Sequence, residues 1–544
     1  MGIGSRDRVQ QSAHDASAVG GHSVTTAVAR KLRLFGGRGM AVLVALAVGL
    51  AGLAASDQAF AVAGGSGPAD AAYGYVVKVN VGGDRGCTGV WVDPQLVATS
   101  KECFQVGTAA PVTGQPPAAS TVATRPDQGS SAQTVAVDYL FVRDDRNLVL
   151  AHLVSGVTGL RGDAPVSTSA PAAGETLRVL GFGRTADEWV PDLPHSGQFS
   201  VQDVSATEID IAPTADGALC KGDAGGPVVR ENGDGTANLV AVVSTSWQGG
   251  CLGVTGTRRD ATATRIDGLA DWINQFKEFE LTGVVEAGAE SGCLVMRVGT
   301  ATYNLAGGDG AVVKIGETVH VYGYRAPSST SSCTEGVRFQ VTQAYRVATL
   351  VGTVTEGVEK CLLLSSGSVT YQLVGGEPAV VKVGAKVTIT GYPISGASKC
   401  SQGTMFRVLS AVPAKQVSLR AHANNKYVTA ESAGASALIA NRTAVGPWEL
   451  FDAFELGNGN IALQAQINRK YVTAENAGAS ALIANRTAVG PWETFLLIHN
   501  ADGSVSLKAQ VNGKYVTAES VGARPLIANR TAIGPWEEFD LITS

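Results

Sequence analysis

Short stretches of alternating apolar and polar residues make up most of this chain, and helical spacing is rare. Between residues 62 and 277 these stretches are separated by Gly, Pro and Asp, a pattern typical of antiparallel strands in a sandwich or barrel. Residues 269–276 have helical apolar spacing instead. We therefore predict an all-β region that closes with a short helix.

Residues 280–412 hold two copies of one strand-rich unit. The segment 312–316 (VVKIG) recurs as 380–384 (VVKVG), and an alternating segment follows each copy. Each copy has two cysteines, and a unit of this size can fold alone when a disulfide closes it. The pattern predicts two small barrels, over residues 280–346 and 349–412, which resemble OB-like barrels.

Residues 416–544 hold three copies of another unit, whose YVTAE segment begins at residues 427, 471 and 515, a period of 44 residues. The segment GPWE recurs with the same period from residue 446. One such unit cannot bury its own apolar face, so we predict a closed threefold body. The KYVTAE and PWE elements resemble those of fascin-like β-trefoils.

The first 61 residues have the pattern of a signal peptide. A basic region with Arg30 and Lys31 precedes an apolar run at 40–55, and a small-x-small cleavage site follows at 59–61. The run has 16 residues, fewer than the roughly 20 of a membrane-spanning helix, and an uncleaved anchor is the alternative. No second apolar run of that length follows. We therefore expect a secreted, extracellular protein without membrane attachment after cleavage.

Composition and charge exclude some classes of function. Lys and Arg total 42 and Asp and Glu 47, and no long run of one sign follows residue 62, so nucleic-acid binding has no electrostatic support. Apolar residues make up 45% of the chain, which is enough to build cores. The 8 cysteines predict disulfides in an oxidising compartment, although their spacing alone leaves the pairing open.

The strongest motif is residues 220–227, CKGDAGGP. With the strand pattern of residues 62–277, it resembles the trypsin-like serine proteases (peptidase family S1), which read C-x-G-D-S-G-G-P there. The resemblance implies a chymotrypsin-like double β-barrel over residues 62–277, with the serine as nucleophile. Ala224 stands at that position, and a methyl group has no lone pair to attack a carbonyl.

The two other positions of the family's triad are also replaced. In residues 99–103 (TSKEC), Glu102 stands where the family has histidine, and a carboxylate cannot shuttle a proton with the pKa of imidazole. In residues 147–153 (NLVLAHL), Asn147 stands where the family has aspartate, and a neutral amide cannot stabilise an imidazolium. His152, Asp144 and Asp145 do not have the strand positions of a substitute triad. We expect no catalytic residues.

Other features of the family's site are retained. The resemblance implies that the backbone N–H groups of Gly222 and Ala224 form an oxyanion hole. It also implies that cleavage after Ala61 frees the amine of Val62 to pair with Asp223, for which turn capping is the alternative.

The resemblance also implies a substrate cleft. Ser246 and Trp247 are similar to the segment that pairs with a substrate backbone, with core packing as the alternative for Trp247. Ala218 stands where trypsins carry a carboxylate, which implies an apolar or small pocket without preference for Arg or Lys. Two family disulfides and the division into small barrels together imply the pairs Cys87–Cys103, Cys220–Cys251, Cys293–Cys333 and Cys361–Cys400.

The C-terminal repeats contain no catalytic set. Each carries one arginine, one tryptophan and one glutamate at equivalent positions. They form either three shallow sites for sugars or acidic groups, or a core filled by the tryptophans with the glutamates paired to basic residues. These residues are Arg442, Arg486 and Arg530, Trp448, Trp492 and Trp536, and Glu449, Glu493 and Glu537.

These observations favour a secreted, catalytically inactive protease homologue that binds a protein, a peptide or an extracellular polysaccharide. One alternative is an active secreted serine-type endopeptidase with a non-standard active site. Another is a carbohydrate-binding protein that acts through the β-trefoil. Nothing in the sequence indicates a cofactor or a metal site.

Overall fold

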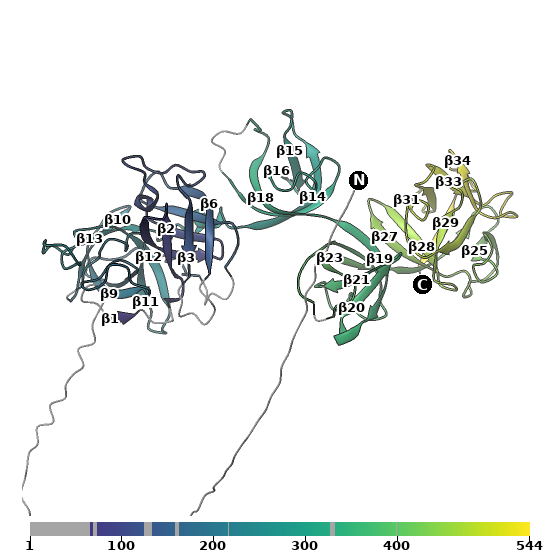
Figure 1. Ribbon diagram of the computed structural model, residues 1–544. Coiled ribbons are helices and arrows are strands. Elements are labelled where there is room, and N and C mark those ends of the chain that lie inside the picture. Colours follow the sequence, from purple (N-terminus) through teal and green to yellow (C-terminus); the bar gives the residue numbers. More distant parts are fainter. Residues whose placement is uncertain are drawn as a thin grey trace, which may run out of the picture. The chain divides into compact units, whose positions relative to one another are not determined.

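The computed structural model describes residues 66–68, 73–124, 133–157, 163–215, 217–326, 332–398 and 400–543. The predicted signal peptide, residues 1–61, and Val62 lie outside the described residues. None of the described helices is both long and apolar enough to cross a membrane. Nearly all regular structure is strand, so the all-β fold class is confirmed (Figure 1).

Two β-barrels form the part of the chain up to residue 265. Six strands close the first barrel in the order β2-β3-β4-β7-β6-β5, around the buried rings of Trp91, Phe104 and Phe141. A 3-10 helix, η2 (Lys101–Phe104), follows β4 directly. The strands are β2 (Val76–Val81), β3 (Arg85–Asp93), β4 (Leu96–Thr99), β5 (Ser120–Ala123), β6 (Thr134–Val142) and β7 (Val149–Leu153).

The second barrel is a ring of strands in the order β9-β10-β13-β12-β11-β8, closed because β8 also pairs with β9. Strand β1 (Ser66–Pro68) pairs with the outer edge of β9. The predicted closing helix is confirmed as α1 (Ala270–Asn274), which buries Ile273. The strands of the ring are β8 (Thr176–Gly181), β9 (His195–Val204), β10 (Glu208–Pro213), β11 (Pro227–Glu231), β12 (Ala237–Ser246) and β13 (Ala261–Arg265).

Two small closed barrels of five strands follow, with the same strand order in each, β14-β15-β16-β18-β17 and β19-β20-β21-β23-β22. Each has one parallel pair, β16 with β18 and β21 with β23. The strands of the first are β14 (Phe279–Ala287), β15 (Leu294–Val298), β16 (Ala301–Gly307), β17 (Thr318–Arg325) and β18 (Val337–Arg346). Those of the second are β19 (Ala348–Glu356), β20 (Leu362–Ser366), β21 (Val369–Val374), β22 (Lys386–Pro393) and β23 (Thr404–Pro413), with the 3-10 helix η3 (Val358–Lys360) after β19.

The remaining strands form one body, which we call the C-terminal body (residues 415–543). Phe451, Phe495 and Phe539, one from each sequence repeat, are fully buried in its core. Its strands are β24 (Lys415–Ala421), β25 (Lys426–Ala430), β26 (Leu438–Arg442), β27 (Phe451–Gly457), β28 (Asn460–Ala465), β29 (Lys470–Ala474), β30 (Leu482–Arg486), β31 (Phe495–His499), β32 (Val505–Ala509), β33 (Lys514–Thr517), β34 (Ile527–Arg530) and β35 (Phe539–Thr543).

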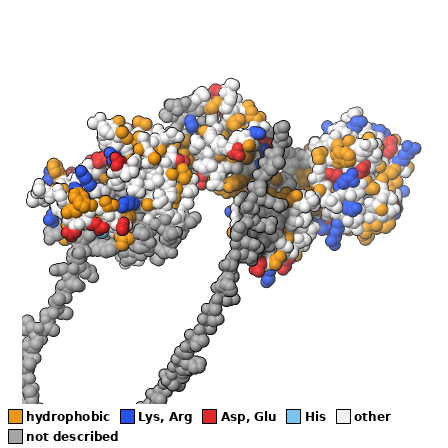
Figure 2. Space-filling view, viewed as in Figure 1, with side chains coloured by type: hydrophobic (Ala, Val, Ile, Leu, Met, Phe, Trp, Pro, Cys, Tyr) orange, Lys and Arg blue, Asp and Glu red, His pale blue; other side chains and the backbone are white. Residues whose placement is uncertain are grey.

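The disulfides agree with those that the sequence implied. The four expected cysteine pairs are all formed, Cys87–Cys103, Cys220–Cys251, Cys293–Cys333 and Cys361–Cys400. On the face shown in Figure 2, acidic and basic side chains lie among neutral ones, without an extended region of one sign.

Candidate functional site

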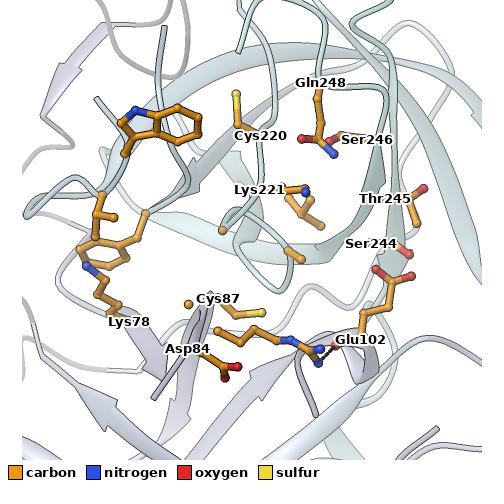
Figure 3. A pocket seen from close by; sticks show the side chains of 18 residues that line it. Lys78, Asp84, Cys87, Glu102, Cys220, Lys221, Ser244, Thr245, Ser246 and Gln248 are labelled. Atoms are coloured by element: carbon orange, nitrogen blue, oxygen red, sulfur yellow. Dashed lines mark hydrogen bonds between the residues drawn. The ribbon is translucent and has the colours of Figure 1, made fainter. Parts of the chain in front are cut away.

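A cavity of about 750 Å³ lies in the part of the chain that forms the two large barrels (Figure 3). Strands β2 and β3, helix η2, strand β12 and the turn at residues 220–226 all contribute to its wall. The lining residues are Lys78, Asp84, Arg85, Gly86, Cys87, Glu102, Phe182, Trp189, Val190, Cys220, Lys221, Gly222, Ala224, Val243, Ser244, Thr245, Ser246 and Gln248.

Ala224 lies in the tight turn at residues 220–226. The backbone oxygen of Ala224 accepts a hydrogen bond from the N–H of Thr88 at 3.0 Å, which ties the turn to the first barrel. Gly225 has φ of +83°, and a Cβ there would lie 1.9 Å from Oγ1 of Thr99. The turn therefore requires glycine at position 225, and Ala224 beside it lines the cavity.

Glu102 lies in the first turn of η2. Ser100 caps this helix, because its Oγ accepts the N–H of Glu102 at 3.3 Å, and Arg85 donates to the backbone oxygen of Glu102 at 3.0 Å. The carboxylate points into the cavity toward Ser244 (Figure 3). No hydrogen bond reaches it from any residue that the structure describes, and partial burial raises the pKa of Glu102. It is a free acceptor on the cavity wall.

Asn147 precedes β7 and joins three segments. Its Oδ1 accepts from the N–H of Lys101 at 3.0 Å and from the hydroxyl of Ser100 at 3.2 Å. Its Nδ2 donates to the hydroxyl of Ser244 at 2.8 Å. Glu102 and Ala224 therefore line one cavity, and Asn147, which does not line it, bonds to Ser244 of its wall, although these residues are far apart in the sequence.

Ser244 was missed by the sequence analysis. It lies two residues before Ser246, in the same STSW segment of β12, and it is the serine that contacts Asn147. Ser246 also lines the cavity. Trp247 is not among the lining residues, and its ring is 59% exposed with the guanidinium of Arg258 at 4.0 Å from its centroid. Trp247 therefore neither contacts the cavity nor packs in the core.

Asp223 is 3% exposed and has two backbone donors. Its carboxylate accepts the N–H of Gly183 and the N–H of Cys220, both at 2.8 Å. Burial raises the pKa of Asp223 to about 6 in spite of these two hydrogen bonds. A Cβ at Gly181 would lie 2.0 Å from its Oδ1, so glycine is required beside it. Since Val62 lies outside the described residues, the ion pair with its amine remains a prediction.

The two N–H groups expected to form an oxyanion hole, those of Gly222 and Ala224, belong to cavity-lining residues. Among the described residues neither N–H has an acceptor, whereas the N–H of Gly225 bonds to Val243 at 2.8 Å. Ala218 is 1% exposed, packs against the disulfide of Cys220 and Cys251, and does not line the cavity.

One rim of the cavity is aromatic and was not foreseen from the sequence. Trp189 is 62% exposed and Val190 is 65% exposed, and both line the cavity. Arg184 stacks over Trp189 at 5.4 Å and donates to Oε1 of Gln248 at 2.8 Å, which joins this loop to the one after β12. Single exposed tryptophans give no pattern in a sequence, so only their position beside the cavity identifies them.

The cavity contains no substitute triad among its described lining residues, which include no histidine. His152 is fully buried, with its Nδ1 2.7 Å from Oδ1 of Asp138, and Asp145 pairs with Arg143. The side-chain hydroxyls of the cavity all come from β12, at Ser244, Thr245 and Ser246.

In the C-terminal body, the expectation that tryptophans fill the core is wrong. The three tryptophans are half-buried, and phenylalanines fill the core instead. The buried glutamates accept hydrogen bonds from a threonine and a glycine of their own repeat; Glu493, for example, binds Thr473 and the N–H of Gly490. The arginines pair with another acid of their own repeat, Arg442 with Glu431, Arg486 with Glu475 and Arg530 with Glu519, and Arg530 also lies 4.0 Å from the buried Glu537.

Comparison with known proteins identifies the class of the first region. The family model described as Trypsin matches residues 62–273, which contain both large barrels and the cavity. This part of the chain is therefore a trypsin-like domain, homologous to the S1 proteases. No curated protein matches the chain. The solved structures that match include a designed 3-fold symmetric protein, ThreeFoil, 23% identical over 23% of this chain and 97% of that chain, with a TM-score of 0.22.

Proposed function

We propose that this chain is a secreted protease homologue whose trypsin-like domain binds a peptide or an extended protein segment in its cavity without hydrolysing it. The observation that carries the proposal is Ala224. It occupies the turn of a trypsin-like site, among the cavity-lining residues, with a side chain that cannot form an acyl-enzyme. Loss of the serine alone lowers turnover roughly a million-fold in a serine protease.

The remaining groups of the cavity suit binding. The N–H groups of Gly222 and Ala224 offer two donors for a carbonyl or carboxylate oxygen. The free carboxylate of Glu102 offers an acceptor for a donor of the ligand. Trp189 supplies apolar area at the rim, where exposed aromatic side chains are typical of binding sites.

Hydrolysis and binding are tested separately. We expect the purified protein to leave casein uncut and to remain unlabelled by a fluorophosphonate. Covalent labelling or casein cleavage would instead support the alternative, an active endopeptidase that uses a hydroxyl of β12. Secretion is tested by N-terminal sequencing of the protein recovered from culture medium, for which we expect Val62 as the first residue.

Binding is tested by fluorescence anisotropy with a labelled library of casein peptides. We expect Trp189→Ala to weaken binding at least about tenfold, because a buried aromatic contact contributes roughly 1–2 kcal/mol. Trp247→Ala is the matched control, since Trp247 is equally exposed but lies outside the cavity. Equal losses in the two variants would show that the peptides do not bind in the cavity.

A polysaccharide ligand for the C-terminal body is a second proposal. Its three half-buried tryptophans are the groups on which a sugar ring would stack, and Arg442 lies 5.9 Å from the ring of Trp448. Retention on insoluble polysaccharides, compared between the full chain and a Trp448→Ala variant, tests this proposal. Failure of both proteins to bind any polysaccharide would exclude it.

A further inference from the structure

The three sequence repeats of the C-terminal body meet at three equivalent places, which we call junctions. One junction differs in its side chains from the other two. In each junction a backbone N–H bonds at 3.0 Å to a carbonyl of the residue after the repeated glutamate. His422 bonds to Glu538, Gln466 to Leu450, and Gln510 to Thr494. The backbone geometry is the same, so the change to a histidine and a glutamate in one junction is not required by the fold.

The contact of the His422 ring with Asp540, which we call its inner contact, has a counterpart in another junction. Its Nε2 lies 2.8 Å from Oδ1 of Asp540, and the amide of Gln466 donates to Oδ1 of Asp452 at the same distance. An ionised carboxylate only accepts hydrogen bonds, so Nε2 carries a proton, and in the neutral imidazole the lone pair is on Nδ1. Arg420 holds Asp540 from the other side at 2.7 Å.

The acidic groups beside the other ring nitrogen of His422 have no counterpart in the junctions of Gln466 and Gln510 that the structure describes. Its Nδ1 lies 3.7 Å from Oε2 of Glu538, and a carboxylate oxygen of Asp502 is close to both. The three ligand atoms lie within 4.8 Å of one another. Asp502 is fixed by its own turn, where Ser504 donates to its Oδ1 from N–H and hydroxyl at 3.0 and 2.7 Å.

We propose that His422, Asp502 and Glu538 form a surface binding site for a divalent transition metal, with Zn²⁺ as the best fit. One imidazole nitrogen and two carboxylate oxygens are a ligand set that Zn²⁺ accepts, with a fourth position left for water or another molecule. Bonds of about 2 Å in a tetrahedron separate ligands by about 3.3 Å, so the side chains need to close only modestly.

The hydrogen bond from His422 to Asp540 strengthens this assignment. A histidine that ligates a metal usually donates its other ring N–H to a carboxylate, which fixes the ring and increases its basicity. A Ca²⁺ site would consist of oxygen ligands alone, six to eight in number. The imidazole therefore distinguishes the two metals. The site lies outside the trypsin-like domain and does not depend on the function proposed for it.

Isothermal titration calorimetry of the full chain with zinc chloride, without a histidine tag, tests the proposal. We expect one Zn²⁺ per chain and at least a tenfold loss of affinity in His422→Gln. This variant should fold normally, because Gln466 makes the same inner hydrogen bond in its own junction. Glu538→Gln is a second variant that we expect to weaken binding in the same way.

The control is Gln466→His. It adds an imidazole to the junction in which Leu450 stands at the position of Glu538. We expect its stoichiometry to remain at one, since the imidazole alone is not the site. Thermal unfolding without metal confirms that each variant is folded. Unchanged affinity in both His422→Gln and Glu538→Gln, no Zn²⁺ binding by the parent chain, or tighter binding of Ca²⁺ than of Zn²⁺ would each overturn the proposal.

Discussion

The side-chain amide of Asn147 donates a hydrogen bond of 2.8 Å to the hydroxyl of Ser244, and this contact joins the first large barrel to strand β12 of the second. The oxygen of the same side-chain amide accepts hydrogen bonds from the N–H of Lys101 and the hydroxyl of Ser100 at the start of η2. Asn147 thus has a structural function of its own in this trypsin-like domain.

This geometry predicts different effects for two substitutions of Asn147. Asn147→Ala removes three hydrogen bonds and should lower the free energy of unfolding by about 1–3 kcal/mol. Asn147→Asp keeps the oxygen that accepts from Lys101 and Ser100, and the hydroxyl of Ser244 can turn to donate to the new carboxylate. We therefore expect the free energy of unfolding to change by less than about 1 kcal/mol. Urea titrations followed by tryptophan fluorescence compare the two, and equal losses would show that the hydrogen bonds contribute little.

The placement of Glu102 and Ala224 on one cavity, with Asn147 bonded to Ser244 of its wall, predicts a gain of function. The triple variant Glu102→His, Asn147→Asp and Ala224→Ser should acquire fluorophosphonate labelling and measurable casein cleavage, because it restores a nucleophile, a base and an orienting carboxylate. The double variant that keeps Ala224 is the control and should stay inactive. A folded triple variant without labelling would mean that the cavity no longer aligns these groups.

The burial of Asp223 predicts a specific pH dependence. Its pKa in the folded state is about 6 when only the two backbone N–H groups bind it, above the roughly 3.9 of an unfolded chain. The folded state then binds more protons between pH ~4 and ~6, so the free energy of unfolding falls as the pH rises through this window. The fall should be about 3 kcal/mol, and it should be absent in Asp223→Asn.

The N-terminus decides the sign of this dependence. A positive amine beside the carboxylate would lower the pKa of Asp223, and stability would then rise with pH or stay level. We predict the fall for a chain that begins at Ala61 and its loss for a chain that begins at Val62. Urea titrations at pH 4, 5 and 6 make the comparison, and the same slope in both chains would exclude the ion pair.

The C-terminal body provides a comparison of a buried and an exposed contact within one repeat. Thr473→Val removes the hydroxyl that donates to buried Glu493 at 2.9 Å, which should cost about 1–3 kcal/mol. Arg486→Ala breaks an ion pair with Glu475 in which the arginine is 42% exposed, and such pairs contribute under about 1 kcal/mol. Thermal unfolding measures both. A larger loss for Arg486→Ala would contradict this ranking.

The sequence predicted much of the fold because local patterns carry that information. Strand alternation and the repeated segments lie within short stretches of chain, and the all-β class and the short helix α1 follow from them. The pairing of the four disulfides was implied by the family resemblance together with the division into small barrels. Glu102, Asn147 and Ala224 could also be proposed as the triad positions, because each stands inside a contiguous motif.

Other site features could not be predicted, since they depend on which side chains meet. Ser244 and Ser246 belong to the same STSW segment, and only the packing of β12 against Asn147 shows which one makes the contact. Trp189 and Trp247 are both exposed tryptophans, and only the path of their loops places the first at the cavity and the second outside it.

The sequence by itself determined that this chain builds β-barrels and carries a trypsin-like motif in which Ala224 is the residue before two glycines. Chemical identity is fixed by the residue, and alternation is fixed by neighbours along the chain. The tertiary structure alone decided that Asn147 joins Ser244, that Asp223 is buried against two backbone N–H groups, and that His422 meets Asp502 and Glu538. These groups are far apart in the sequence and come together only when strands pair.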